Sequence, residues 1–201
     1  YSRQEPLISV CIATYNRAEL VTTRAIPSIL AQDYRNFELI VVGDACTDDT
    51  AEVVATFQDP RIRFVNRAVN FGEQSAPSND GFKLASGGLI AYLNQDDLWF
   101  PDHLECLVRY IDETRADLVY SLRFSADPHG LFFCGVTNAE LRYDPTHLLE
   151  ASLWLVRRDR ALLHGRAAGE EGEGPGARPS RGHPEGGAAG AAAGTDVGDG
   201  G

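Results

Sequence analysis

The feature that most constrains this chain is a regular alternation of short apolar runs with longer helical patterns. Apolar runs of this length, rich in β-branched residues, are typical of buried strands. Strands are predicted at 7–13, 37–42, 61–66 and 89–93, and helices at 18–32, 47–57, 78–86 and 101–114. Strands that alternate with helices in this way predict an α/β fold with a mostly parallel sheet flanked by helices.

The pattern continues less clearly beyond residue 114. Strands are predicted at 117–124, 131–136 and 152–156, with a turn at 127–130 and a helix that begins near Arg158.

The last 37 residues, 165–201, have a different composition, because 13 are Gly and 8 are Ala. Such a segment buries too little apolar surface to offset its chain entropy, so we expect a disordered tail. The sequence therefore predicts one domain at 1–164, with a first half at about 7–115 and an incomplete second half at about 116–164. The absence of Met indicates that Tyr1 is not the initiating residue.

Polar side chains directly follow three of the predicted strands. They are Thr14-Tyr15-Asn16 after the first strand, Asp44 after the second and 94–97 after the fourth. Ligands of open parallel sheets bind outside the carboxyl ends of the strands. We therefore expect these three clusters to meet at one edge of the sheet and to form a binding site there.

The pair Asp96-Asp97 is the most distinctive of these clusters. Adjacent carboxylates repel each other, so they need either full solvation or a compensating positive charge. One interpretation is a solvated pair that favours the start of a helix near Pro101. The other is a site for a divalent cation, because hard cations prefer carboxylate oxygens.

Charge and cysteine content narrow the class of protein. The net charge of −11 and a pI of about 4.8 disfavour nucleic acid as a partner. No run of 18 apolar residues predicts a membrane span, and the N-terminus lacks the apolar core of a signal peptide. Peripheral association with a membrane stays open.

The four cysteines form no CxxC pair, and Cys11 and Cys106 fall in apolar patterns typical of core thiols. We interpret the chain as cytoplasmic, with the inner face of a membrane as an alternative location.

Four segments in order resemble the family 2 glycosyltransferases. ISVCIATYNR at 8–17 resembles their opening strand, and ELIVVGDACTDDT at 38–50 resembles their second strand with its acidic turn. NDG at 79–81 with ASG at 85–87 resembles the helix before their acidic strand. NQDDLW at 94–99 resembles their DxD metal motif.

The resemblance, which covers roughly residues 7–160, implies a GT-A fold and an enzyme that transfers a sugar. A Rossmann-like half would hold a UDP-, GDP- or dTDP-sugar, and a less regular half would hold a hydroxyl acceptor on a glycan, lipid or small molecule. The implied residues are Thr14, Tyr15, Asn16, Asp44, Asn79 and Asp96 for the nucleotide-sugar and Asp97 with Asp96 for Mn²⁺ or Mg²⁺. The cation would neutralise the charge of the diphosphate leaving group.

The sequence departs from the family pattern at several positions. Gly43 replaces the first acid of the usual pair, Asn94 stands where another Asp is common, and Ser78 stands where many members have Arg. The catalytic base usually follows the segment that resembles 152–158, but here the Gly/Ala-rich tail begins. Glu170-Glu171 lacks the surrounding pattern, so the catalytic base is unknown.

Two other functions are compatible with parts of this pattern. A truncated or catalytically inactive relic that still binds a nucleotide-sugar would also lack the base. A nucleotidyltransferase uses a similar sheet and Mg²⁺, but it normally has a glycine-rich loop after the first strand. Here that loop is Thr14-Tyr15-Asn16-Arg17, which contains no glycine.

Overall fold

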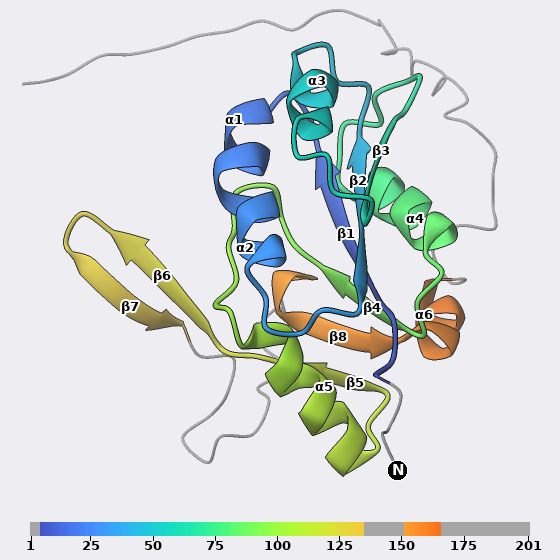
Figure 1. Cartoon of the computed structure of the whole chain (residues 1–201), viewed down its shortest axis with the longest axis vertical. Helices are drawn as coiled ribbons and strands as arrows, with labels where there is room; N and C mark the ends of the chain where they lie inside the picture. The colour runs from blue at the N-terminus through green and yellow to red at the C-terminus, as the bar shows by residue number, and fades with distance from the viewer. Residues whose placement is uncertain (1–4, 135–150, 166–201) are drawn as a thin grey trace, which may run out of the picture. The chain divides into compact units, whose positions relative to one another are not determined.

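The central sheet has six strands in the order β3-β2-β1-β4-β8-β5 (Figure 1). This architecture comes from a computed structural model that describes residues 5–134 and 151–165. The strands are β1 (Ile8–Thr14), β2 (Phe37–Gly43), β3 (Ile62–Asn66), β4 (Leu89–Tyr92), β5 (Leu118–Tyr120) and β8 (Trp154–Arg157). Neighbours among β1 to β4 are parallel, and β8 is antiparallel to both β4 and β5. The predicted α/β fold with a mostly parallel sheet is confirmed.

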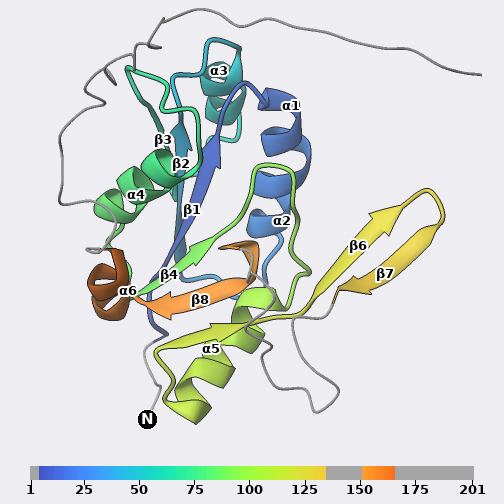
Figure 2. The same ribbon diagram turned by 180° about the vertical axis from the view of Figure 1, so that it is seen from behind.

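Helices cover both faces of this sheet (Figures 1 and 2). One face packs against α1 (Ala18–Leu20), α2 (Ile26–Leu30), α3 (Thr50–Ala55) and α5 (His103–Thr114), and the other against α4 (Ser75–Leu84) and α6 (Arg158–Gly165). All seven residues of β1 are buried, as expected for a central strand of a parallel sheet that is covered on both sides. In contrast, β3 alternates between partly buried and exposed residues, because it forms one edge of the sheet.

The first helical segment is continuous but not uniform. A wider π-helical stretch at Val21–Ala25 joins α1 to α2. It ends two residues before Pro27, which has no N–H to donate to the preceding turn. Local widening of the helix accommodates such a residue. The segment ends at Leu30, two residues before the predicted end.

Three predicted helix starts were wrong. The helix α3 begins at Thr50, three residues after the predicted Thr47, with Asp49 at its N-cap. Proline is the reason for the other two. The helix α4 begins at Ser75, three residues before the predicted Ser78, because Pro77 is tolerated in a first turn whose N–H groups lack helical partners. The helix α5 begins at His103, whereas Pro101 lies in the turn before it. The carbonyl of Pro101 instead accepts a hydrogen bond from the backbone N–H of Asp33.

The strand predicted at 117–124 divides into two strands that belong to different sheets. The first part is β5, and the second is β6 (Arg123–Asp127), which pairs with β7 (Gly130–Cys134) in a separate hairpin (Figure 1). The predicted turn at 127–130 is confirmed, since Asp127 pairs with Gly130 around Pro128 and His129. Periodicity could not reveal the division, because both parts have strand-like composition.

Some predictions fall on residues that the structure does not describe. The end of the strand at 131–136, the acidic pair at 170–171 and the tail from 166 onward lie outside the described residues. All the described residues fall within one unit, Tyr1–Ala167, so the division at residue 164 stays a prediction. Within the described part, no helix combines the length and apolar character needed to cross a membrane.

The two cysteines predicted to be core thiols differ in the structure. Cys11 is buried in β1, which confirms its prediction. Cys106 is only partly buried, because the buried stripe of α5 consists of Leu104, Leu107, Val108 and Ile111 and passes beside it. Its Sγ lies 3.7 Å from Oδ2 of Asp102.

Candidate functional site

The ends of β1 and β4 are tied together by one glutamine side chain. Oε1 of Gln95 accepts hydrogen bonds from Oγ1 of Thr14 at 2.8 Å and from the backbone N–H of Tyr15 at 3.2 Å. The end of β2 joins them, because the N–H of Asp44 donates to the carbonyl of Thr14 at 2.8 Å. The predicted convergence of polar clusters from β1, β2 and β4 at one edge of the sheet is therefore confirmed.

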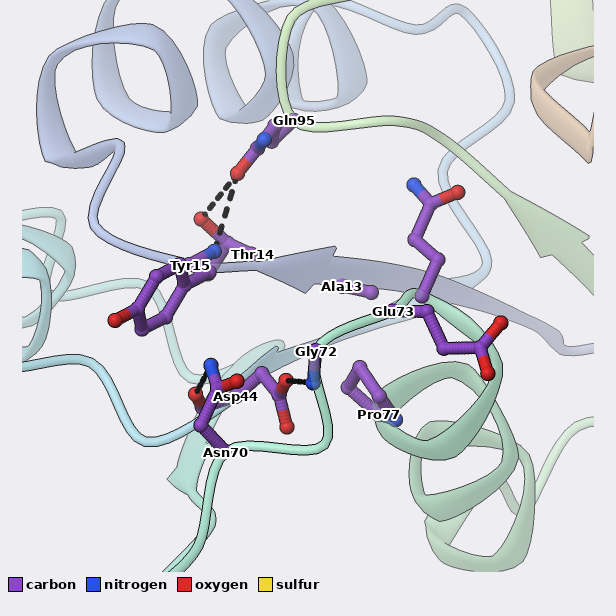
Figure 3. Close-up of a pocket in the computed structure, with 10 residues that line it drawn as sticks. Ala13, Thr14, Tyr15, Asp44, Asn70, Gly72, Glu73, Pro77 and Gln95 are labelled. Carbon is purple, nitrogen blue, oxygen red and sulfur yellow. Dashed lines mark hydrogen bonds between the residues drawn. The ribbon is translucent and has the colours of Figure 1, made fainter. Parts of the chain in front are cut away.

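A pocket of about 290 Å³ lies at this edge (Figure 3). Tyr15, half of whose surface is exposed, lies near Asn70 and Asp44, and Gln95 is hydrogen-bonded to its backbone (Figure 3). The lining residues are Ala13, Thr14, Tyr15, Asp44, Asn70, Gly72, Glu73, Gln74, Pro77 and Gln95. The pocket thus combines an aromatic ring, an apolar floor and several hydrogen-bonding groups, which is the usual chemistry of a small-molecule site.

Asp44 is buried, and its carboxylate organises the loop between β3 and α4. It accepts hydrogen bonds from the backbone N–H groups of Phe71 and Gly72 and from Nη1 of Arg67. Burial opposes ionisation of this carboxyl, but these hydrogen bonds outweigh it and hold its pKa below the ordinary value. Asp44 therefore shapes the pocket as an ionised anchor for residues 70–72.

The guanidinium of Arg67 forms ion pairs with two carboxylates. Its Nη1 lies 2.5 Å from Oδ1 of Asp44, and its Nε lies 2.9 Å from Oδ2 of Asp80. The ammonium of Lys83 lies 3.3 Å from the other oxygen of Asp80. Both basic residues near α4 are thus paired with a carboxylate, which disfavours them as contacts to a diphosphate.

Asn16 joins two loops. It adopts a left-handed backbone with φ of +49°, and its Oδ1 accepts hydrogen bonds from the N–H groups of Thr47 and Asp48. Asp48 in turn accepts from the N–H of Ala18, the first residue of α1, and of Thr50, the first residue of α3. Asn16 does not line the pocket, so the structure favours a role in positioning the loops beside it.

The acidic pair lies beside the pocket, at the start of the segment between β4 and α5. Asp96 is exposed and Asp97 is partly buried. Oδ2 of Asp97 accepts hydrogen bonds from Nδ2 of Asn94 at 2.9 Å and from Oγ of Ser152 at 2.6 Å. No described residue donates a hydrogen bond to Oδ1 of Asp97.

These two carboxylates fit a cation that brings its own additional ligands. The described residues contain no cluster of three or more His, Cys, Asp or Glu side chains suited to a metal. Mg²⁺ typically takes one or two protein carboxylates and completes its coordination with phosphates and water. The donor set of Asp96 and Asp97 matches that pattern rather than a complete protein cage.

The structure also places the remaining predicted residue and brings in others. Asn79 lies on the exposed side of α4 and outside the pocket lining. Gln95, Gln74 and Ser152 were missed by sequence reasoning, although Gln95 lies inside the motif at 94–97. Ser152 carried no local sequence signal, because its contact with Asn94 depends on how β8 pairs with β4.

The comparisons with known proteins agree with this architecture. The sequence model described as Glycosyl transferase family 2 matches residues 9–159. The chain is 36% identical over 110 residues to the putative colanic acid biosynthesis glycosyl transferase WcaA of Escherichia coli (strain K12), which is 54% of this chain and 39% of that protein. It is 34% identical over 114 residues to UDP-Glc:alpha-D-GlcNAc-diphosphoundecaprenol beta-1,3-glucosyltransferase WfgD of Escherichia coli, or 57% and 44% of the two chains. The chain thus spans less than half the length of these relatives.

Solved structures show the same fold. S. aureus TarS 1–349 in complex with UDP-GlcNAc has a TM-score of 0.66 and 23% identity, covering 80% of this chain and 47% of that one. The mannosyltransferase PcManGT from Pyrobaculum calidifontis, in complex with GDP-Man and Mn²⁺, has a TM-score of 0.62 and 20% identity with the same coverage. The GT-A fold expected from the resemblance is confirmed. With three quarters of its residues, 9–159, matched by the family's sequence model, the chain belongs to glycosyl transferase family 2.

Proposed function

We propose that this chain transfers a sugar from a nucleoside-diphosphate sugar to a hydroxyl acceptor. The observation that carries the proposal is the joining of β1, β2 and β4 around one polar pocket with an acidic pair beside it. Hydrogen bonds from Thr14 and Tyr15 to Gln95 hold these parts together. Family membership and the donors bound by TarS and PcManGT support a nucleotide-sugar as the ligand.

In this proposal the pocket receives the nucleoside end of the donor. The exposed ring of Tyr15 offers a stacking surface for a base, and Thr14 and Asn70 offer polar contacts at its edge. Asp44 lines the pocket and keeps residues 70–72 in place through their backbone. Asn16 and Asn79 lie outside the lining, so we assign Asn16 a positioning role and expect little from Asn79.

Asp97 and Asp96 would hold Mn²⁺ or Mg²⁺ in this proposal. A bound cation would neutralise negative charge on the diphosphate leaving group. The protein's own part is to place the donor's anomeric carbon against the acceptor and to keep the acidic segment fixed. An acceptor hydroxyl also needs a base, which we do not assign to a described residue.

Thermal unfolding of the full chain with UDP, GDP, dTDP or CMP, each with and without Mn²⁺, tests the proposal. A nucleotide at 100 times its dissociation constant stabilises the folded state by about 2.7 kcal/mol. For a chain of this size that corresponds to a rise in Tm of roughly 5–10 °C. We expect such a rise for one nucleoside diphosphate, dependent on Mn²⁺ and abolished in Asp97→Ala.

Asp33→Ala is the matched control, because Asp33 is an exposed aspartate outside the pocket lining. It should retain the full shift. A folded wild-type chain that responds to none of the nucleotides would overturn the proposal. Binding without sugar transfer to any acceptor would identify a nucleotide-sugar-binding relic instead of an active transferase.

A further inference from the structure

The carboxylate of Asp97 is held by two donors that end on the same oxygen. Oγ of Ser152 donates at 2.6 Å and Nδ2 of Asn94 at 2.9 Å, both to Oδ2. Two fixed donors on one oxygen restrict rotation of the carboxylate, while no described residue donates a hydrogen bond to the second oxygen, Oδ1. The orientation of Asp97 is therefore set by residues that are not themselves acidic.

Ser152 is well suited to this role because it is buried and is held by two hydrogen bonds besides the one that it donates to Asp97. It is buried, with 4% of its surface exposed. Its Oγ accepts a hydrogen bond from the backbone N–H of Asn94 at 2.9 Å, and its carbonyl accepts one from Nε1 of Trp99 at 2.7 Å. With its oxygen engaged by Asn94, the hydroxyl proton of Ser152 points to Asp97.

The sheet explains how a residue 55 positions away reaches the acidic segment. Antiparallel pairing of β4 with β8 places Ala91 opposite Leu155. Ser152 lies in the short 3-10 helix Ala151–Leu153 that leads directly into β8, so it meets Asn94 just beyond the paired ends of the two strands. The contact thus follows from the core of the fold rather than from a chance approach of two loops.

Asn94 extends the contact to the pocket. Its Oδ1 accepts a hydrogen bond from Nε2 of Gln74 at 2.8 Å, and Gln74 lines the pocket. A chain of hydrogen bonds therefore runs from the pocket wall through Asn94 to Asp97. An aspartate at position 94 could not donate a hydrogen bond to Asp97 and would place a third negative charge in the segment.

We propose that Ser152 and Asn94 are positioning residues that orient Asp97 for a divalent cation. This inference rests on the proposed function, since it requires Asp97 to be a cation ligand. Groups that orient a ligand through hydrogen bonds commonly change metal affinity by 10- to 100-fold when they are removed. Their loss should weaken cation binding specifically, because neither residue lines the nucleotide pocket.

The test measures two affinities for each variant of the full chain. One is the affinity for the nucleotide identified by thermal unfolding, measured at saturating Mn²⁺. The other is the affinity for Mn²⁺ at saturating nucleotide, read from the electron paramagnetic resonance signal of free Mn²⁺. For Ser152→Ala we expect Mn²⁺ affinity to fall 10- to 100-fold while nucleotide affinity stays within twofold of wild type.

Ser9→Ala provides a matched control. Ser9 is also a buried serine whose hydroxyl donates to a carboxylate, that of Glu38, but it lies at the opposite end of β1 from the pocket. It should change neither affinity, even if it lowers stability. Asn94→Ala, at a partly buried position, is the second variant and should also lower Mn²⁺ affinity, so the test does not depend on Ser152→Ala folding.

The outcomes separate the two proposals. If the wild-type chain binds no Mn²⁺ in the presence of nucleotide, the proposed function fails. If the wild type binds Mn²⁺ but the folded Ser152→Ala and Asn94→Ala variants bind it as tightly, the positioning role is overturned. A parallel loss of nucleotide and Mn²⁺ affinity would indicate general distortion and would also overturn it.

Discussion

Gly43 stands where family 2 sequences usually have the first of two acids, and its surroundings give a packing reason. A Cβ at this position would lie 2.5 Å from Oδ1 of Asn66 and 3.0 Å from Sγ of Cys46. The side-chain amide of Asn66 is hydrogen-bonded to both backbone groups of Cys46. Its Oδ1 accepts from the N–H of Cys46 at 2.8 Å, and its Nδ2 donates to the carbonyl at 2.9 Å. Asn66 thus occupies the space that an acidic side chain at position 43 would need.

This crowding predicts that Gly43→Ala destabilises the fold. Overpacking of a tight site typically costs about 1–3 kcal/mol of unfolding free energy, which urea denaturation would measure. The control is Gly88→Ala, because a Cβ there would meet no atom within 4 Å and should change stability by less than about 0.5 kcal/mol. Equal costs for the two substitutions would show that Asn66 and Cys46 move aside easily.

At the scale of elements, one buried glutamine connects α2 to α5. Gln32 is completely buried, and its Nε2 donates to the carbonyls of Ser28 and Phe100. Its Oε1 accepts from the N–H of Leu104 in the first turn of α5, at 2.9 Å. The side chain therefore fixes the segment that leads from the acidic pair into α5.

Gln32→Leu keeps the approximate volume but leaves the buried N–H of Leu104 without this partner. Each buried polar group left unsatisfied costs about 1–3 kcal/mol, so we expect a loss of at least that size in chemical denaturation. Glu113→Leu, at an exposed position of α5, should stay within about 0.5 kcal/mol of wild type. A loss no greater than that of the control would mean that water replaces the glutamine.

The elements also show what the sequence could and could not reveal. Strands β1, β2 and β4 were predictable because both faces of each are buried, which gives continuous apolar runs. The convergence of Thr14, Asp44 and 94–97 followed from the rule for parallel sheets. Ser152 and Gln32 could not be assigned, since their contacts depend on strand register and helix packing rather than on local pattern. The hydrogen bonds that Asp44 accepts from Phe71 and Gly72 could not be predicted either, because only the fold brings that loop to Asp44.

For the whole molecule, several buried or paired groups couple stability to pH. Burial of His103 lowers its pKa to about 4, and the nearby Asp102 opposes this shift only in part. Burial opposes ionisation of Asp44, Asp48 and Glu38, but hydrogen bonds outweigh it and lower the pKa of each. Both effects favour unfolding in acid, but they act in different pH ranges.

The direction in which His103 changes stability with pH follows from its lower pKa in the folded state. Its contribution to stability is complete above the ordinary value of 6.5 and is lost as the pH falls toward about 4, since the unfolded chain binds the proton more tightly. The carboxylates, in contrast, lose their contribution only below their ordinary values of 3.8 to 4.5. The range between pH 6.5 and about 4.5 therefore reports mainly on His103 among these groups.

The substitution His103→Phe distinguishes the pH dependence due to His103 from that due to the carboxylates. The imidazole is stacked on Trp99 with ring centroids 4.5 Å apart, and a phenyl ring can keep that contact without titrating. We expect the unfolding free energy of the wild type to decline between pH 6.5 and 4.5 and that of the variant to stay flatter, with the steeper decline below pH 4.5 unchanged. Urea denaturation at half-unit steps of pH would measure both curves. Parallel curves over the upper range would show that His103 is accessible to protons in the folded chain and that its burial does not contribute to acid sensitivity.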